Sequence, residues 1–205
     1  MPSDARLLVG IFVGGRGSRM GGVAKGMLKA PDSEATLVER LRAELGTALP
    51  DAEVVLVGRA DAYAAVGLRA VSDEPPGVGP LGGLVGLLAE AERRRAELVL
   101  ALACDLPRIG AALLQRLASE RPDQSALVAL QGRIRNPLVA RYAVAQALPA
   151  AREALSAGQR SLQAVLDRLG EGVATLSLTP AEAATLDDWD TPEDRLRGLA
   201  SAHEE

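Results

Sequence analysis

Short apolar segments of strand length alternate along this chain with longer segments of helical composition. In residues 37–49 apolar side chains recur at helical spacing, and residues 81–95 begin apolar and end charged. Such alternation is typical of βαβ units, and near-continuous apolar strands indicate a parallel sheet that is covered on both faces. We therefore predict an α/β fold, a Rossmann-like three-layer sandwich with a mostly parallel central sheet. The expected strands cover residues 7–13, 54–57, 98–103, 126–130 and 173–178.

The length of the chain suits one domain. It has 205 residues, within the range of roughly 100 to 250 residues over which a single hydrophobic core is common. Hydrophobic residues make up 48% of the chain and aromatic residues only 2%, so the core must be built mainly from Leu, Val and Ala. We expect a single domain over residues 1–205.

Charge and composition exclude several classes of function. The formal net charge of -4 argues against broad binding to nucleic acid or to anionic membranes, which needs a basic face. Cys104 is the one cysteine, which rules out an internal disulfide and favours the cytoplasm. His203 is the one histidine, so a Ser-His or Cys-His nucleophile cannot be assembled. No apolar run approaches the roughly 18 residues of a membrane span.

The glycine-rich stretch "IFVGGRGSRMGGVAKG" follows the first expected strand. It is not the dinucleotide fingerprint, because Met20 stands where the third glycine belongs, and it is not a P-loop, because Gly26 follows Lys25. Glycines still let backbone N–H groups approach phosphate oxygens, and Arg16, Arg19 and Lys25 would add positive charge. The stretch indicates a cradle for a triphosphate. A flexible glycine loop with solvated basic side chains is the alternative.

In an open α/β sheet, ligands bind where the strands deliver their carboxyl ends. Asp105 comes just after the apolar strand 98–103. Its carboxylate suits Mg²⁺, a cation that prefers oxygen ligands. The alternative is an ordinary aspartate that caps a helix beginning at Pro107. Cys104, its neighbour, is expected to be a small buried apolar residue.

A second group of candidates lies between residues 73 and 84. Asp73 has the chemistry to accept hydrogen bonds from N1–H and N2–H₂ of guanine, or it is a turn residue in "DEPPG". "GPLGGL" places Gly79, Pro80 and Leu81 at an expected helix start, where unpaired N–H groups suit a base or a ribose.

Four of these short motifs together resemble one family. "GGRGSRMGGVAKGML", "GPLGGL", "CDLP" and "WDTPED" follow one another in the order seen in the molybdenum cofactor guanylyltransferases, the MobA-like proteins of the nucleotidyltransferase superfamily. The resemblance touches both ends of the chain. It implies transfer of GMP from GTP to the phosphate of molybdenum-loaded molybdopterin, with release of pyrophosphate and with Mg²⁺ as cofactor. Other proteins of molybdenum cofactor synthesis stay open as partners.

The resemblance also implies roles for individual residues. Arg19, Lys25 and Asp105 would be catalytic, and Asp105 would bind the metal. Asn136, Asp188 and Asp190 would contact the acceptor, with Asp190 as a further candidate for metal. The expected GTP contacts are Phe12, Val13, Gly14, Gly15, Lys25, Val57, Asp73, Gly79, Pro80, Leu81 and Asp105.

Some positions leave alternatives open. Asp188 and Asp190 precede Thr191-Pro192, a good helix start, and stand where the family usually has asparagine. Asn136 follows the basic turn "QGRIR", where Arg133 or Arg135 could meet a pterin phosphate, or where the chain is only a surface loop.

The loop departs from the family at its start and before its lysine. Ala24 stands where the family has an acid, and Phe12 and Val13 replace its leucine and alanine. A relative that uses CTP or a sugar-phosphate acceptor therefore stays open. So does a nucleotide-binding relative without turnover.

Overall fold

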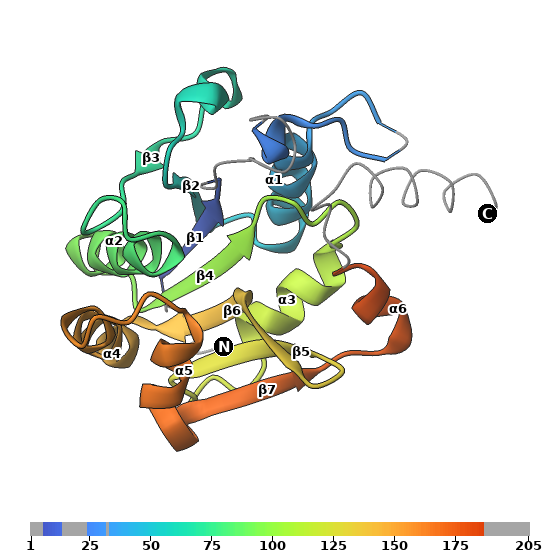
Figure 1. Ribbon diagram of the computed structural model, residues 1–205. Helices are drawn as coiled ribbons and strands as arrows, with labels where there is room; N and C mark the ends of the chain where they lie inside the picture. Colours follow the sequence, from blue (N-terminus) through green and yellow to red (C-terminus); the bar gives the residue numbers. More distant parts are fainter. Residues whose placement is uncertain (1–5, 14–23, 32, 187–205) are drawn as a thin grey trace.

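The computed structural model describes residues 6–13, 24–31 and 33–186 (Figure 1). Within these residues the strands form one sheet in the order β3-β2-β1-β4-β6-β5-β7. The strands are β1 (Leu7–Phe12), β2 (Glu53–Val57), β3 (Ala70–Val71), β4 (Leu98–Ala103), β5 (Ala126–Gln131), β6 (Ile134–Ala143) and β7 (Val173–Ser177).

Four of the six strand pairs in this sheet are parallel. β1 pairs in parallel with β2 on one side and with β4 on the other, and the pairs β2–β3 and β5–β7 are also parallel. β1 is buried on both faces: Leu8 is 1% exposed, and Val9 and Ile11 are fully buried. The prediction of a mostly parallel sheet with near-continuous apolar strands is confirmed.

β6 is a strand that the sequence pattern did not predict. It runs antiparallel to β4 and to β5, across a part of the chain that was open to interpretation as a surface loop. Asn136 and Pro137 interrupt the apolar pattern by which this strand could have been predicted. The pairing register between β5 and β6 shifts at this point, from Val128 opposite Ala140 to Ala129 opposite Asn136. Such an irregularity tolerates a proline, which has no N–H to give to the ladder.

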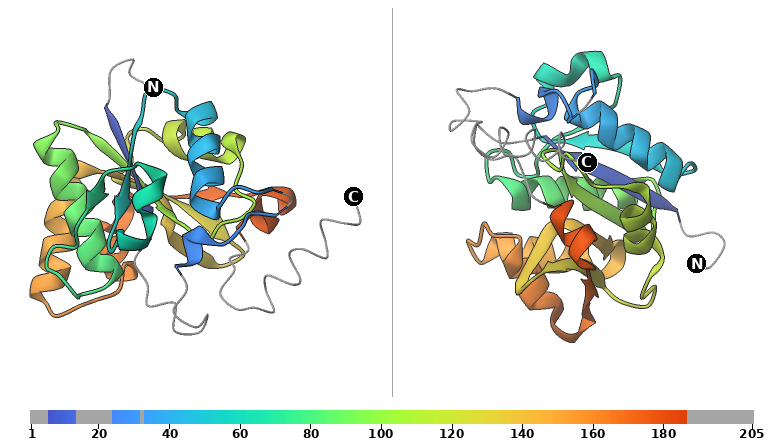
Figure 2. Two further views of the ribbon diagram at one scale, coloured as in Figure 1. Left: turned by 90° about the horizontal axis from the view of Figure 1, so that it is seen from above. Right: turned by 90° about the vertical axis from the view of Figure 1, so that its right-hand side faces the viewer.

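Helices cover both faces of the sheet, so the molecule has three layers (Figure 2). On one face, α2 (Pro80–Arg93) packs against α4 (Val144–Ser156), which in turn packs against α5 (Gln163–Leu169). On the other face, α1 (Leu37–Ala48) packs against α3 (Ala111–Ser119). The short α6 (Pro180–Ala184) lies near α3, because Glu182 pairs with Arg116 at 2.6 Å. The predicted α/β three-layer sandwich is confirmed.

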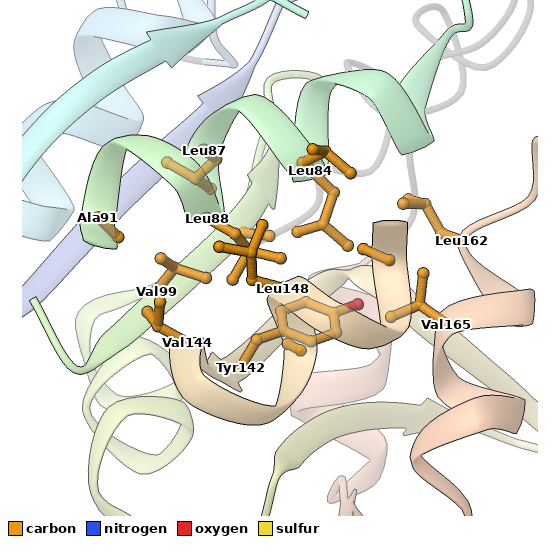
Figure 3. Packing of buried hydrophobic residues seen from close by; sticks show 14 of the residues in the cluster. Leu84, Leu87, Leu88, Ala91, Val99, Tyr142, Val144, Leu148, Leu162 and Val165 are labelled. Carbon is orange, nitrogen blue, oxygen red and sulfur yellow. The ribbon is translucent and has the colours of Figure 1, made fainter. Parts of the chain in front are cut away.

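The cores between the layers are mainly aliphatic, as the composition predicts. Under α2, the side chains of Leu84, Leu87 and Leu88 meet Val99 of β4 and Leu148 of α4 (Figure 3). Tyr142 of β6 is an aromatic exception in this core, and its hydroxyl donates to the carbonyl oxygen of Pro137 at 2.8 Å. A buried hydroxyl needs such a partner.

The first turn of α2 and the segment before it are held together closely. Gly79 is the N-cap and Pro80 the first residue of α2, so the predicted helix start is confirmed. A Cβ atom at Gly86 would lie 2.2 Å from the carbonyl oxygen of Ser72, and the N–H of Glu74 donates to the carbonyl oxygen of Gly82 at 2.9 Å. Residues 72–74 therefore lie directly on the helix, and the position of Asp73 is fixed by it.

Arg141 of β6 is fully buried, which is rare for arginine. Its guanidinium donates to the carbonyl oxygens of Ala118, Glu120 and Arg121 at 3.1, 2.8 and 2.5 Å. Carbonyl oxygens at the end of a helix have no intrahelical partner and carry partial negative charge. Arg141 thus fastens the end of α3 to the sheet.

The loop after β4 contradicts one of the two interpretations of Asp105, that it caps a helix. α3 begins at Ala111, with Gly110 as its N-cap, so Asp105 does not cap a helix that starts at Pro107. Leu106 and Ile109 of this loop are buried in the core beneath α1 and α3. None of the described helices is long and apolar enough to cross a bilayer.

Candidate active site

Three strands deliver their carboxyl ends to one edge of the sheet. Phe12 at the end of β1 lies opposite Val57 of β2 and opposite Ala103 of β4. The N–H of Val13 donates to the carbonyl oxygen of Val57 at 3.0 Å, and the N–H of Cys104 donates to that of Phe12 at 3.2 Å. The predicted nucleotide contacts Phe12, Val13 and Val57 therefore share this edge with Asp105.

Lys25 and Asp105 meet at this edge. The Nζ atom of Lys25 donates to Oδ2 of Asp105 at 3.0 Å, and the two side chains are only 23% and 15% exposed. Lys25 opens the short 3-10 helix η2 (Lys25–Met27), and Asp105 follows β4. The structure brings these two predicted catalytic residues together from positions 80 residues apart.

A buried tyrosine lies beneath the pair. Tyr63, in the 3-10 helix η3 (Asp61–Val66), is 2% exposed, and its hydroxyl accepts a hydrogen bond from the N–H of Gly26 at 3.2 Å. The same hydroxyl lies beside the side chain of Cys104, close enough for each group to influence the pKa of the other. Burial, aided by the charge of Asp105, raises the pKa of the Cys104 thiol to about 12, although Lys25 acts in the opposite direction. Cys104 is a buried thiol, in agreement with its expected interior role.

Asp73 lies beside the first turn of α2. A Cβ atom at Gly83 would be 3.0 Å from Cε1 of Phe12, 3.1 Å from Cγ1 of Val57 and 3.3 Å from Oδ1 of Asp73. The end of β1, the end of β2 and the Asp73 carboxylate therefore converge on this helix turn. Burial raises the pKa of Asp73, and the positive charge of Arg59 partly offsets that effect.

The three residues at the start of α2 offer different surfaces. Gly79 is half-buried with a φ of 87°, in the range that favours glycine, and Pro80 is exposed. Leu81 is fully buried in the core.

The acceptor candidates are described only in part. Asn136 is half-buried near the start of β6, and because β6 is antiparallel to β4 this start lies at the same edge as Asp105. The guanidinium of Arg135 pairs with Asp167 of α5 at 2.6 Å. The remaining predicted residues lie outside the described part of the chain: Gly14, Gly15, Arg16, Arg19, Asp188, Asp190 and the Thr191-Pro192 helix start.

Chemically, this edge can bind an anion and a cation side by side. Among the residues that the structure describes, no group of three or more His, Cys, Asp or Glu side chains is arranged to hold a metal ion. A single carboxylate such as that of Asp105 is nevertheless sufficient for Mg²⁺ when substrate phosphates and water supply the other ligands. The residues present fit that arrangement.

Sequence reasoning did not single out Tyr63 or Arg59. Tyr63 is one of only two tyrosines in the chain, which is a weak signal. Its partners Gly26 and Cys104 are distant in sequence, so spacing alone does not reveal the contact.

Comparison with known proteins identifies the family of the chain. The family model described as MobA-like NTP transferase domain matches residues 9–173. The chain is 36% identical to the molybdenum cofactor guanylyltransferase of Pseudomonas syringae pv. syringae, over 78% of each chain. It is 32% identical to the protein of that name from Pseudomonas putida, over 89% of this chain and 92% of the relative.

Solved structures show the same fold at lower identity. Molybdopterin-guanine dinucleotide biosynthesis protein A from Archaeoglobus fulgidus superposes with a TM-score of 0.74 at 23% identity, covering 97% of this chain and 100% of the other. A 4-diphosphocytidyl-2C-methyl-D-erythritol synthase from Anaerococcus prevotii reaches the same TM-score at 12% identity, covering 97% and 96%. The family model that matches residues 9–173 and the sequence relatives at 32% and 36% identity show that the chain belongs to the MobA-like NTP transferase family.

Proposed function

We propose that this protein transfers GMP from GTP to the phosphate of molybdenum-loaded molybdopterin, with Mg²⁺ as its cofactor. An acceptor phosphate oxygen attacks the α-phosphorus, the bond from that phosphorus to the bridging oxygen of the β-phosphate breaks, and pyrophosphate leaves. The observation that carries the proposal is the Lys25–Asp105 pair at the carboxyl edge of β1 and β4. The names of the relatives support the identity of the substrates.

The proposed roles follow from charge. Such a transfer requires mainly positioning and neutralisation of the phosphate charge, and a phosphate monoester needs little activation because it is already largely dianionic near neutral pH. Lys25 would bind phosphate oxygens and stabilise the leaving pyrophosphate, assisted by Arg19. Asp105 would hold Mg²⁺, which when bound neutralises phosphate charge.

Guanine would be recognised beside α2. The carboxylate of Asp73 would accept from the two N–H donors on the Watson–Crick edge of the base, and the backbone at Gly79, Pro80 and Leu81 would line the pocket. Phe12, Val13 and Val57 would form its floor at the strand ends, and Gly14 and Gly15 would let the nucleotide lie against the backbone.

The proposal also covers the acceptor site, the domain and the location of the protein. Asn136, Asp188 and Asp190 are proposed acceptor contacts, with Asp190 also proposed for metal. Residues 1–205 are proposed to form one domain. One sheet runs without interruption from β3 to β7 in the described residues, which supports this proposal. Residence in the cytoplasm rests on the single cysteine.

Protection from thermal unfolding shows whether the protein prefers GTP or CTP. Thermal unfolding is measured with Mg²⁺ and either GTP or CTP, because a ligand that binds only the folded state raises the melting temperature according to its affinity. We expect clear protection by GTP and little by CTP. Equal protection would remove the case for guanine and favour a cytidylyltransferase.

Turnover is tested with molybdopterin-type acceptors and GTP, by measuring released pyrophosphate. Release that depends on the acceptor supports the transferase. Tight GTP binding without pyrophosphate release would instead indicate a nucleotide-binding relative, with Ala24 in place of the family's acid as its cause.

A further inference from the structure

We propose that Tyr63 is a positioning residue, whose buried hydroxyl sets the geometry of Lys25 and Asp105 without touching a substrate. The inference rests on the proposed function, since it concerns the two residues that would bind the phosphates and the metal. Tyr63 lies in η3, the 3-10 helix that follows β2, and this segment contains none of the sequence motifs of the site.

Tyr63 lies between the two chain segments that carry the ion pair. The hydroxyl of Tyr63 accepts from the N–H of Gly26, the residue after Lys25, and it lies beside the side chain of Cys104, the residue before Asp105. Tyr63 therefore lies next to both of the chain segments that carry the Lys25–Asp105 ion pair. The one hydroxyl accepts from the Gly26 N–H, and its own proton is available to the sulfur of Cys104.

Packing shows that this geometry is tight. A Cβ atom at Gly26 would lie 2.5 Å from Cγ2 of Val38 and 2.9 Å from Cε1 of Tyr63. The tyrosine ring therefore lies against the backbone of η2, and residue 26 has room only for glycine. A displacement of Tyr63 must move η2, and Lys25 with it.

Tyr63 itself is held by the protein core. The guanidinium of Arg42 on α1 donates to the carbonyl oxygen of Val66 at 2.8 Å, and the N–H of Tyr63 donates to that of Ala60 at 2.8 Å. η3 is therefore fastened to α1, which makes it a rigid support. Catalytic groups held by such supports keep the sub-ångström geometry that phosphoryl-type transfer requires.

The hydroxyl acts as a neutral hydrogen-bonding group. Burial raises the pKa of Tyr63 far above its usual range, and the nearby Cys104 and Asp105 raise it further. A side chain that is 2% exposed cannot contact a nucleotide. Its influence on the reaction must pass through Gly26 and Cys104.

The test compares Tyr63→Phe with a matched control, Tyr142→Phe. Both tyrosines are buried, and each hydroxyl bonds to one backbone group, but Tyr142 lies in the core under α2 and α4 (Figure 3). We expect the two variants to lose similar amounts of thermal stability. Only Tyr63→Phe should lower kcat, on the order of tenfold or more, because small misplacements of reacting groups are costly. Only this variant should need more Mg²⁺ for half-maximal rate.

A second readout does not depend on activity. Hydrogen exchange of the Gly26 amide is measured in the wild type and in both variants. We expect it to accelerate in Tyr63→Phe, because the N–H loses its acceptor, and to stay unchanged in Tyr142→Phe.

The outcomes separate this inference from the proposed function. An active wild type, with Tyr63→Phe equal to Tyr142→Phe in kcat and in Mg²⁺ dependence, overturns the positioning role and leaves the transferase intact. An inactive wild type overturns the proposed function, and the exchange of Gly26 then decides whether Tyr63 supports η2. Unchanged exchange in Tyr63→Phe would contradict that support.

Discussion

The Nζ atom of Lys25 lies 3.0 Å from Oδ2 of Asp105, and each side chain is largely shielded from water. Opposite charges in such a setting attract more strongly than the same charges on an exposed surface. Under the proposed function, the ammonium would exchange its partner for phosphate oxygens and the carboxylate would exchange its partner for a cation. The pair would then keep the site neutral until the substrate separates it.

Asp105→Asn tests this relationship directly. The amide keeps the shape of the side chain but loses its charge, so it neither pairs with Lys25 nor serves as a strong Mg²⁺ ligand. We expect the rate of GMP transfer to fall by about a hundredfold or more, since loss of one strong electrostatic contact in a transition state has this order of effect. The fold should persist, as judged by circular dichroism.

A surface pair supplies the control for that variant. Lys29 and Glu34 form an ion pair at 2.5 Å, but their side chains are 59% and 92% exposed. Exposed pairs contribute little to stability, so Glu34→Gln should match the wild type in stability and rate. Near-normal turnover in Asp105→Asn would remove the proposed metal ligand.

The pH dependence of GTP binding should report on Asp73. Only the ionised carboxylate accepts from both N–H donors of guanine, and burial raises the pKa of Asp73 above that of an ordinary aspartate. Binding should therefore be full at neutral pH and weaken on acidification, earlier than an exposed aspartate would allow. The measurement is the Kd for Mg-GTP across acidic pH, by calorimetry.

A variant of Arg59 gives a second test of the pH dependence assigned to Asp73. Its charge lowers the pKa of Asp73, so Arg59→Gln should move the midpoint of the pH dependence to higher pH. In Asp73→Asn, affinity should be lower and this acidic transition should be absent. A transition that persists in Asp73→Asn would assign it to another group.

The sequence predicted the strands of the sheet centre better than the site. β4 was predicted with its observed ends, Leu98–Ala103, because a continuous apolar run stops at Cys104-Asp105. β6 was missed, since the polar and proline residues at 136–137 fall where the ladder is irregular.

The arrangement of the site residues could not be predicted from the sequence for a different reason. The residue types at Lys25, Asp73 and Asp105 indicated phosphate, base and metal chemistry, but their distances depend on the register of three strands. Tyr63 contacts Gly26 across 37 residues. A contact of this kind arises from tertiary packing and leaves no periodic pattern in the chain.

Two glycines in helices should respond in opposite ways to alanine. At Gly86 a Cβ atom would lie 2.2 Å from the backbone oxygen of Ser72, whereas at Gly46 of α1 it would meet nothing within 4 Å. We expect Gly86→Ala to destabilise the protein by about 1–3 kcal/mol, the usual cost of overpacking, and to weaken GTP binding by moving Asp73. Gly46→Ala should stabilise it by about 0.5–1 kcal/mol.

Urea unfolding measures both free energies, and Gly46→Ala also serves as the control for nucleotide affinity. If Gly86→Ala kept both its stability and its affinity for GTP, the segment 72–74 would not be held by α2 in the manner described.

Glu90 should make stability depend on pH in the acid range. It sits near the end of α2 with its side chain 10% exposed, and it pairs with Arg69, Arg93 and Arg94 at 2.6, 2.5 and 2.6 Å. Burial alone would raise its pKa. Hydrogen bonds from Arg94 and Arg93 and the charge of Arg69 outweigh burial and lower the pKa from 4.5 to about 2.

The sign of the effect follows from linkage. Because the folded protein holds the Glu90 proton less tightly than the unfolded chain, the stabilisation is complete above pH 4.5 and is lost as pH falls toward 2. Glu90→Gln should lower the free energy of unfolding by about 1–3 kcal/mol near neutral pH, a range that allows for solvent screening by the partly exposed arginines. Its difference from the wild type should shrink between about pH 4.5 and pH 2. Glu92→Gln, on the exposed side of the same helix, should leave the free energy of unfolding near neutral pH almost unchanged. A constant gap between Glu90→Gln and the wild type across acidic pH would contradict the proposed ionisation.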